Sequence, residues 1–230
     1  MKRKPGKAFI FLNGDLSDMS RVKPYIDDRT LLIGCDGGTR HILALGYKPG
    51  AVIGDFDSLE SLAGDIIDRL KRSGRQSTNI NGTVYIRYPA DKDQTDSELA
   101  IRYAAKRGCH QIILAGLLGT RLDHLLGNVL LLTKDEFSEL DIKIIEGSQE
   151  IYLMHGPARI VGTPGDIISF IPIAGSARVS STTGLKYDLS QYDLSPQSNH
   201  GISNVLTKPI ALVNIKTGML LVIHERQTTL

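Results

Sequence analysis

Two aspartates separated by one residue follow a short apolar segment of this 230-residue sequence, where AVIG (51–54) runs into Asp55, Phe56 and Asp57. In extended backbone, residues two apart point the same way, with Cα atoms about 7 Å apart. A turn or a helix start needs one acidic residue at most. Two carboxylates about 4 Å apart repel each other by a few kcal/mol, so the pair predicts a cation beside it.

Aspartates also follow other apolar segments of this half of the sequence. They are Asp36 after TLLIGC (30–35), Asp93 and Asp96 after TVYIRY (83–88), and Asp123 after QIILAG (111–116). If these segments are parallel strands, their carboxyl ends meet at one edge, where open α/β sheets bind ligands. Carboxylate oxygens without His or Cys partners favour Mg²⁺ bound together with substrate phosphates. His124, next to Asp123, is expected to be a hydrogen-bonded core residue.

Groups that suit phosphate lie in the same segments. Gly37 and Gly38 allow the backbone to approach an anion at a helix start, and Lys92 and Arg121 can neutralise phosphate oxygens. The sequence has no GxxxxGK[ST], no GxGxxG after a strand and no GxSxG. A P-loop enzyme, a dinucleotide-binding fingerprint and an α/β-hydrolase nucleophile are therefore excluded.

The elements that must position these residues alternate along the chain. Short β-rich segments lie at 8–13, 30–35, 51–53, 83–88, 111–116 and 141–146. Their alternation with helical stretches predicts an α/β fold with a parallel sheet. Helices are expected at 94–107 and at 121–134, the second deeply buried because its apolar pattern is nearly continuous. The polar, Gly- and Asn-rich segment 71–83 is expected to be a loop or a flexible hairpin.

The pattern changes after Gly147. Short strands separated by Gly, Pro and Ser at close spacing predict an antiparallel β sandwich or flattened barrel. We therefore predict two domains. Residues 1–147 form a Rossmann-like α/β domain that carries the predicted Mg²⁺ and phosphate site, and residues 148–230 form an all-β, sandwich-like domain.

Composition narrows the class of protein. The net charge is +2, which gives no electrostatic indication of a nucleic-acid or membrane partner. No segment approaches the roughly 20 apolar residues of a membrane helix, and no signal peptide is recognisable. Cys35 and Cys109 give no disulfide framework and are expected to be small buried hydrophobes. A cytoplasmic location is expected.

The motifs, taken together and in order, resemble the thiamine pyrophosphokinase (thiamine diphosphokinase) family. They are GCDGGTRHILALGYKPGAVIGDFDSL, YPADKDQTDSELAI, GLLGTRLDHLLGNVLLL, TTGLKYDL and SNHGISN, between about residues 34 and 204. The resemblance implies a homodimer with the active site at the interface, and a β domain that contributes to thiamine binding and dimerisation. It also implies transfer of the β,γ-diphosphoryl unit of ATP to the hydroxyl of thiamine, giving thiamine diphosphate and AMP.

The same resemblance implies roles for individual residues. Asp55, Asp57 and Asp96 would hold Mg²⁺, Asp36, Gly37, Lys92, Asp93, Thr95, Arg121 and Asp123 would line the ATP site, and Ser203 and Asn204 would meet the aminopyrimidine of thiamine. Tyr187 follows the GLK motif where some family members have Trp, and it would offer its ring to the cationic thiazolium.

Asp57, Asp96 and Arg121 are the residues expected to act in the chemical step. Asp57 is the preferred proton acceptor for the attacking alcohol, and Asp55 is expected to be a ligand only. Three alternatives stay open on the sequence. They are another Mg²⁺-dependent pyrophosphokinase with a hydroxymethylpterin acceptor, a Mg²⁺-dependent phosphohydrolase, and a non-catalytic regulator that binds nucleotide or thiamine.

Overall fold

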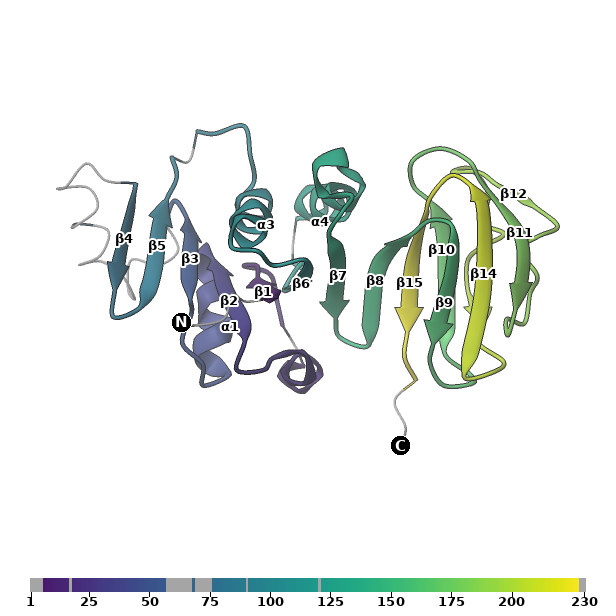
Figure 1. The fold of residues 1–230 in the computed structure, drawn as a ribbon, viewed down its shortest axis with the longest axis horizontal. Helices are drawn as coiled ribbons and strands as arrows, with labels where there is room; N and C mark the ends of the chain where they lie inside the picture. The colour runs from purple at the N-terminus through teal and green to yellow at the C-terminus, as the bar shows by residue number, and fades with distance from the viewer. Residues whose placement is uncertain are drawn as a thin grey trace. The chain divides into compact units, whose positions relative to one another are not determined.

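A computed structural model describes residues 6–16, 18–56, 68, 76–89, 91–119 and 121–227. The chain divides into two compact units, which can be followed by colour in Figure 1. Unit 1 comprises Met1–Leu131 and Glu139–Ile142, and unit 2 comprises Leu132–Ser138 and Lys143–Leu230. Within the ranges that the structure describes, no helix is long and apolar enough to cross a membrane.

The strands of unit 1 form a mainly parallel sheet in the order β6-β1-β2-β3-β5-β4. Their bounds are β1 Lys7–Phe11, β2 Thr30–Cys35, β3 Ala51–Gly54, β4 Ser77–Ile80, β5 Thr83–Arg87 and β6 Gln111–Ala115. Phe9 of β1 pairs with Leu32 of β2 and with Ile113 of β6, both in parallel. Nearly continuous burial along β1, β3 and β6 is typical of strands covered on both faces. The predicted parallel sheet is confirmed.

The β4–β5 hairpin includes the described part of segment 71–83, which is predicted to be a loop or a flexible hairpin. Of that segment, residues 76–83 are described, and they form β4, a turn at Asn81 and Gly82, and the first residue of β5. Asn81 and Gly82 both have positive φ, 51° and 87°, which an Asn-Gly pair adopts readily in a two-residue hairpin turn. The hairpin alternative is confirmed for these residues.

Three helices of unit 1 are described: α1 Thr39–Ala44, α3 Asp96–Lys106 and α4 Leu122–Leu130. Short 3-10 helices precede them at Met19–Arg21, Lys23–Tyr25 and Asp36–Gly38. Helix α3 begins where the Thr95 hydroxyl accepts a hydrogen bond from the Glu98 N–H, an arrangement that satisfies a free donor of the first turn. It buries Leu99, Ile101 and Ala104, so the predicted helix 94–107 is confirmed.

The prediction of a deeply buried helix at 121–134 is wrong. Helix α4 ends at Leu130, a 3-10 turn at Leu131–Thr133 follows, and none of the residues of α4 is buried. Leu122, Leu126 and Leu130 are 66%, 52% and 50% exposed. Residues four apart lie on one face of a helix, so the sequence defines an apolar face without defining what covers it. These three leucines are called the α4 face below.

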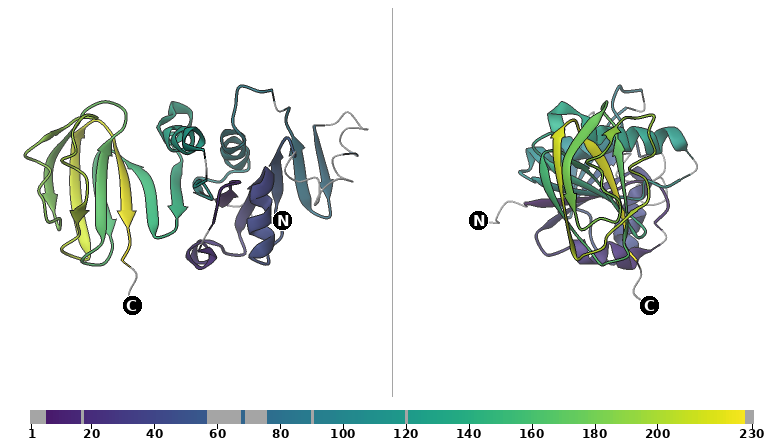
Figure 2. Two further views of the ribbon diagram at one scale, coloured as in Figure 1. Left: turned by 180° about the vertical axis from the view of Figure 1, so that it is seen from behind. Right: turned by 90° about the vertical axis from the view of Figure 1, so that its right-hand side faces the viewer.

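Unit 2 contains two antiparallel groups of strands, in the orders β13-β10-β15-β8-β7 and β12-β11-β14-β9, shown in green to yellow in Figure 2. Their bounds are β7 Asp141–Glu146, β8 Gln149–Met154, β9 Pro157–Val161, β10 Ile167–Pro172, β11 Ala177–Thr183, β12 Asp193–Leu194, β13 Asn204–Val205, β14 Ile210–Thr217 and β15 Leu220–Glu225. A further 3-10 helix spans Asp135–Phe137. Both groups contribute to one core, for example Phe170 of β10 and Val213 of β14. The predicted antiparallel β region is confirmed.

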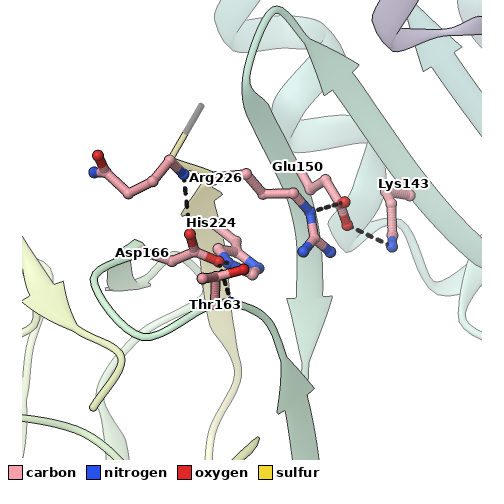
Figure 3. A network of polar contacts seen from close by, with 7 residues as sticks. Lys143, Glu150, Thr163, Asp166, His224 and Arg226 are labelled. Atoms are coloured by element: carbon pink, nitrogen blue, oxygen red, sulfur yellow. Dashed lines mark hydrogen bonds and ion pairs between the residues drawn. The ribbon is translucent and has the colours of Figure 1, made fainter. Parts of the chain in front are cut away.

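A polar network fixes the C-terminal end of β15 (Figure 3). His224 Nε2 lies 2.8 Å from Asp166 Oδ2, and both side chains are buried. Burial acts to raise the pKa of Asp166, but hydrogen bonds from the N–H groups of Thr163 and Gln227 and from His224 hold it below its ordinary value. A buried carboxylate is tolerated when its oxygens are satisfied in this way.

Candidate active site

A cavity of about 420 Å³ lies at the carboxyl ends of the parallel strands of unit 1. Its acidic lining residues are Asp36 after β2, Asp55 after β3, Asp96 at the start of α3, and Asp123 in α4. Lys92 and Thr95, which precede α3, line it as well. Parallel strands deliver their exits to one edge, and the structure brings these six predicted residues together. We call this space the unit 1 cavity.

Asp36 is held by the backbone of the next strand exit. Its Oδ1 accepts a hydrogen bond of 3.0 Å from the Phe56 N–H. Asp36 and Phe56 both have positive φ, 44° and 70°, although Phe56 is fully buried. A Cβ on Gly54 would overlap the Asp36 carboxyl group, so only glycine fits there. Strained backbone of this kind is retained where the surroundings fix it, often at functional sites.

The unit 1 cavity holds more negative than positive charge. Burial raises the pKa of Asp36 to about 8, and the hydrogen bond and charge of Asp96 and the charge of Asp55 act in the same direction. The Phe56 N–H opposes this shift. Lys92 Nζ lies 2.5 Å from Asp96 Oδ1, so the ammonium group balances one carboxylate. The remaining excess of negative charge is offset in part by a proton on Asp36, whose pKa is raised.

The start of α3 is tied to α4 beside the cavity. Thr95 Oγ1 and Ser97 Oγ lie 2.8 Å apart, and the Ser97 hydroxyl donates to Asn128 Oδ1 over 2.6 Å. Cys35 is buried under the same segment, with its Sγ 3.6 Å from the main-chain oxygen of Asp96. Burial raises the pKa of the Cys35 thiol well above its ordinary value. Cys35 and Cys109 are both buried, as expected of small buried hydrophobes.

Arg121 and Asp123 form an exposed ion pair next to the cavity. Arg121 Nη2 lies 2.6 Å from Asp123 Oδ2, and each side chain is 64% exposed. Hydrogen bonding to Arg121 holds the pKa of Asp123 at about 2. Asp123 lines the cavity while Arg121 does not. The guanidinium is therefore next to the cavity only because it is paired with Asp123.

Besides Arg121, the predicted residues Gly37 and Asp93 do not line the cavity. Asp93 is exposed and does not line it. Gly37 is buried behind it, and its main-chain oxygen accepts a hydrogen bond from Arg40. Asp57 lies outside the described residues.

The carboxylate oxygens that line the cavity are suitable ligands for a hard divalent cation. Two of the three predicted ligands, Asp55 and Asp96, line it together with Asp36, and the charges of both add to burial in raising the pKa of Asp36. Within the described ranges, no group of three or more His, Cys, Asp or Glu residues is arranged to hold a metal ion. The complete ligand set predicted from the sequence includes Asp57.

Several cavity residues were missed by the sequence reasoning. Asn13, Gln94 and Asn128 line the cavity. Gln94 and Asn128 lie within the quoted motifs YPADKDQTDSELAI and GLLGTRLDHLLGNVLLL without an assigned role, and no motif includes Asn13. The prediction for His124 is wrong, because this residue is exposed and lines the cavity instead of the core. The i, i+4 relation of His124 to Asn128 places both on one helix face, which is the signal that could have found it.

The residues expected to bind thiamine lie in unit 2. Asn204 is buried, accepts at Oδ1 from the N–H groups of Tyr187 and Val205, and donates from Nδ2 to the Tyr187 carbonyl oxygen over 2.8 Å. Ser203 has a φ of 56°, and its N–H donates to Ser169 Oγ. The Tyr187 ring is about half exposed, with Lys186 Nζ 5.2 Å from its centre. Asn204 therefore holds the backbone that presents the Tyr187 ring.

Comparisons with known proteins identify the family that both parts of the chain resemble. Residues 22–144 match the family model described as thiamin pyrophosphokinase, catalytic domain, and residues 152–220 match the one described as thiamin pyrophosphokinase, vitamin B1 binding domain. A thiamine pyrophosphokinase of Bacillus subtilis is 30% identical over 211 residues, which cover 87% of this chain and 90% of that protein.

Solved structures give the same result. The crystal structure of thiamine pyrophosphokinase from Bacillus subtilis matches with a TM-score of 0.78 and 28% identity, over 96% of this chain and all of the other. The thiamin pyrophosphokinase from Geobacillus thermodenitrificans matches with a TM-score of 0.75 and 26% identity, over 96% of this chain and 98% of the other.

Proposed function

The chain belongs to the thiamine pyrophosphokinase family, and from this premise we propose that it transfers diphosphate from ATP to the hydroxyl group of thiamine at the unit 1 cavity. The products are thiamine diphosphate and AMP. The observation that carries the proposal is the set of carboxylates from separate strand exits in one cavity, next to Lys92 and the start of α3. Such a set suits a triphosphate bound together with a divalent cation.

We assign roles to these residues from the charges of their side chains. Asp55, Asp57 and Asp96 would hold Mg²⁺, and when bound the ion supplies positive charge that neutralises the phosphate oxygens. Lys92 binds a phosphate oxygen on the side that Asp96 leaves open. Arg121 turns from Asp123 toward the leaving group, which costs little because this ion pair is exposed. Gly37, Asp93 and Thr95 belong to the segments that surround the nucleotide.

A proton must leave the attacking hydroxyl of thiamine. We propose that Asp57, the residue that follows Phe56 in the sequence, accepts it. Phe56 is fully buried and in a strained conformation, so the segment is fixed up to the residue next to the base. Asp57→Asn should abolish turnover while leaving the fold intact, and a near-normal kcat would remove Asp57 from this role.

Unit 2 supplies the thiamine contacts in this proposal. We assign residues 1–147 to a Rossmann-like catalytic domain and residues 148–230 to a sandwich-like domain for thiamine binding and dimerisation. Tyr187 presents an exposed ring, which can stack on the cationic thiazolium. Ser203 contacts the aminopyrimidine, and Asn204 acts through the Tyr187 backbone that it holds.

We also propose that the protein is a homodimer with its active site at the interface. The α4 face offers a row of exposed leucines directly beside cavity residues of the same helix. A contiguous exposed apolar face is uncommon on a monomer and marks an interaction surface. A second copy that covers this face would also exclude water from the cavity edge.

Product analysis tests the proposed reaction. The protein is incubated with ATP, Mg²⁺ and thiamine, and nucleotides and thiamine esters are separated by chromatography. AMP and thiamine diphosphate in equal amounts are expected. ADP with thiamine monophosphate, free phosphate alone, turnover only with a hydroxymethylpterin, or binding without turnover would each contradict the proposal and indicate one of the alternatives.

A further inference from the structure

The loop after β1 is held by the first turn of α1. The Arg40 guanidinium donates to the main-chain oxygens of Asn13 and Gly14, each over 2.9 Å, and to that of Gly37 over 3.1 Å. It also contacts the side-chain oxygen of Asn13. His41 Nε2, on a buried ring, lies 2.9 Å from the Gly14 oxygen. Two consecutive residues of α1 therefore fix the Asn13–Gly14 backbone.

The exit of β6 holds the same loop from the other side. The Gly14 N–H donates to the Gly116 oxygen over 2.8 Å, and the Asp15 N–H donates to the Leu118 oxygen over 2.6 Å. A Cβ on Gly14 would overlap both of these acceptor oxygens. The loop thus has one position, set by the strands on either side of β1, and Asn13 lies at the cavity wall in that position.

Arg40 also decides which way the Asn13 amide faces. A guanidinium donates hydrogen bonds and accepts none, so the atom in contact with it must be the amide oxygen. The Asn13 Nδ2 group, with its two hydrogens, then faces away from Arg40. In the part of the chain that the structure describes, this group has no hydrogen-bond partner.

We propose that Asn13 is a further nucleotide-binding residue, whose Nδ2 donates a hydrogen bond to an oxygen of the bound triphosphate, and that Arg40 is the positioning residue that fixes its amide. The inference rests on the proposed use of the unit 1 cavity for ATP. Most charged groups of this cavity are carboxylates, which repel phosphate, and Lys92 is already paired with Asp96. A neutral donor with a fixed direction can bind a phosphate oxygen in such a cavity without competing for the carboxylates.

Asn13→Asp removes the proposed hydrogen-bond donor, Nδ2, while keeping the size and shape of the side chain. Arg40 can still bind the carboxylate oxygen, so the fold should be kept, but an acceptor with negative charge replaces the donor. We expect the dissociation constant and the KM for ATP to rise roughly 10- to 100-fold, with the KM for thiamine and the Tm unchanged. Asn79→Asp is the matched control, because Asn79 is exposed in β4 of the same unit and uses only its oxygen, as an acceptor.

Arg40→Lys tests the positioning role. Lysine keeps the charge but loses the planar fork that reaches three main-chain oxygens, so the KM for ATP should rise while kcat at saturating ATP falls by a smaller factor. In the double variant with Asn13→Asp, the loss of ATP affinity should be less than the product of the two single effects, since both act through one amide. Fully independent effects would overturn the positioning role.

The outcome for Asn13 is separable from that for the proposed reaction. Calorimetric titration of the wild-type protein with ATP and Mg²⁺ measures nucleotide binding without any acceptor, and product analysis measures the reaction. A wild type that binds ATP but makes no thiamine diphosphate contradicts the reaction and leaves the Asn13 variants fully informative. An Asn13→Asp protein that binds ATP within twofold of wild type overturns the inference, whatever the acceptor.

Discussion

Asp36, which follows β2, and Asp96, which begins α3, line the same cavity, and Asp96 acts to raise the pKa of Asp36. A proton on Asp36 relieves the repulsion between two neighbouring carboxylates. Burial is the largest cause that raises the pKa of Asp36 to about 8, and Asp96 is the next. The pair is therefore a place where protons and a divalent cation compete, and this competition can be measured.

The pH dependence of folding stability should reveal the proton on Asp36. The pKa of Asp36 is near 3.8 in the unfolded chain and about 8 in the folded one, so between these pH values the folded state holds a proton that the unfolded state lacks. Stability then falls as pH rises from about 4 to about 8. In Asp36→Asn the fall in the free energy of unfolding across this pH range should be smaller by on the order of 2 kcal/mol.

Urea unfolding in EDTA at pH 5 and pH 8, followed by circular dichroism, measures the effect. Asp193→Asn, at an exposed residue of β12 that lies 3.6 Å from Arg178, is the control and should keep the wild-type slope. Identical slopes for wild type and Asp36→Asn would show that Asp36 is not protonated in the folded state.

Mg²⁺ should stabilise the protein more at pH 8 than at pH 5.5. At the lower pH a proton occupies Asp36, next to the predicted ligands Asp55 and Asp96, and binding the cation favours its release. We expect 10 mM Mg²⁺ to raise the Tm by a few degrees at pH 8, on the basis of simple ligand linkage, and by about a third of that at pH 5.5. Calcium at the same concentration reports on the size selectivity of the site.

Asp55→Asn and Asp96→Asn should each abolish most of this Mg²⁺-dependent shift, since both residues line the cavity. Asp193→Asn should leave it unchanged. A shift that is equal at both pH values, or that survives in Asp96→Asn, would place the cation elsewhere on the protein.

The Tyr187 ring should set thiamine affinity. Tyr187→Ala removes an aromatic face that is about half exposed, and the KM for thiamine should rise roughly 5- to 10-fold, as expected for a cation–π contact of about 1 kcal/mol. Tyr187→Phe keeps the face and should stay within about twofold. Steady-state kinetics at saturating ATP measure both.

Asn204→Asp supplies a second test of the same region. The substitution keeps the acceptor for the Tyr187 and Val205 N–H groups but removes the donor to the Tyr187 oxygen. We expect a loss of about 1–3 kcal/mol in stability together with a higher KM for thiamine, while the KM for ATP is unchanged. Equal increases in both KM values would indicate a general structural defect.

A charge on the α4 face should weaken self-association. Leu126→Glu places a carboxylate at the middle of the exposed leucines of α4, where burial against a second copy would cost several kcal/mol. We expect a dimer for wild type and a monomer for the variant in light scattering after size exclusion at micromolar concentration. Leu43→Glu, on the exposed side of α1, is the matched control. A variant that remains dimeric would assign the interface to another surface.

The sequence alone determined the elements that depend on local pattern. The apolar segments that form β1, β2, β3, β5 and β6 are short, and they alternate with helical stretches, which is sufficient to predict parallel strands. The sequence also predicted that Asp36, Asp55, Asp96 and Asp123 lie close together, because parallel strands end at one edge of their sheet. The family motifs occur in the same segments because they form these exits.

Only the tertiary structure decided which side chains meet across segments and which surfaces stay uncovered. The same apolar period describes α3, which is buried, and α4, which is exposed, because periodicity defines a face but not its neighbour. Arg40 with Asn13, and Asn204 with Tyr187, are contacts between residues far apart in sequence. Such contacts follow no periodic pattern in the sequence, because the two residues become neighbours only when the chain folds.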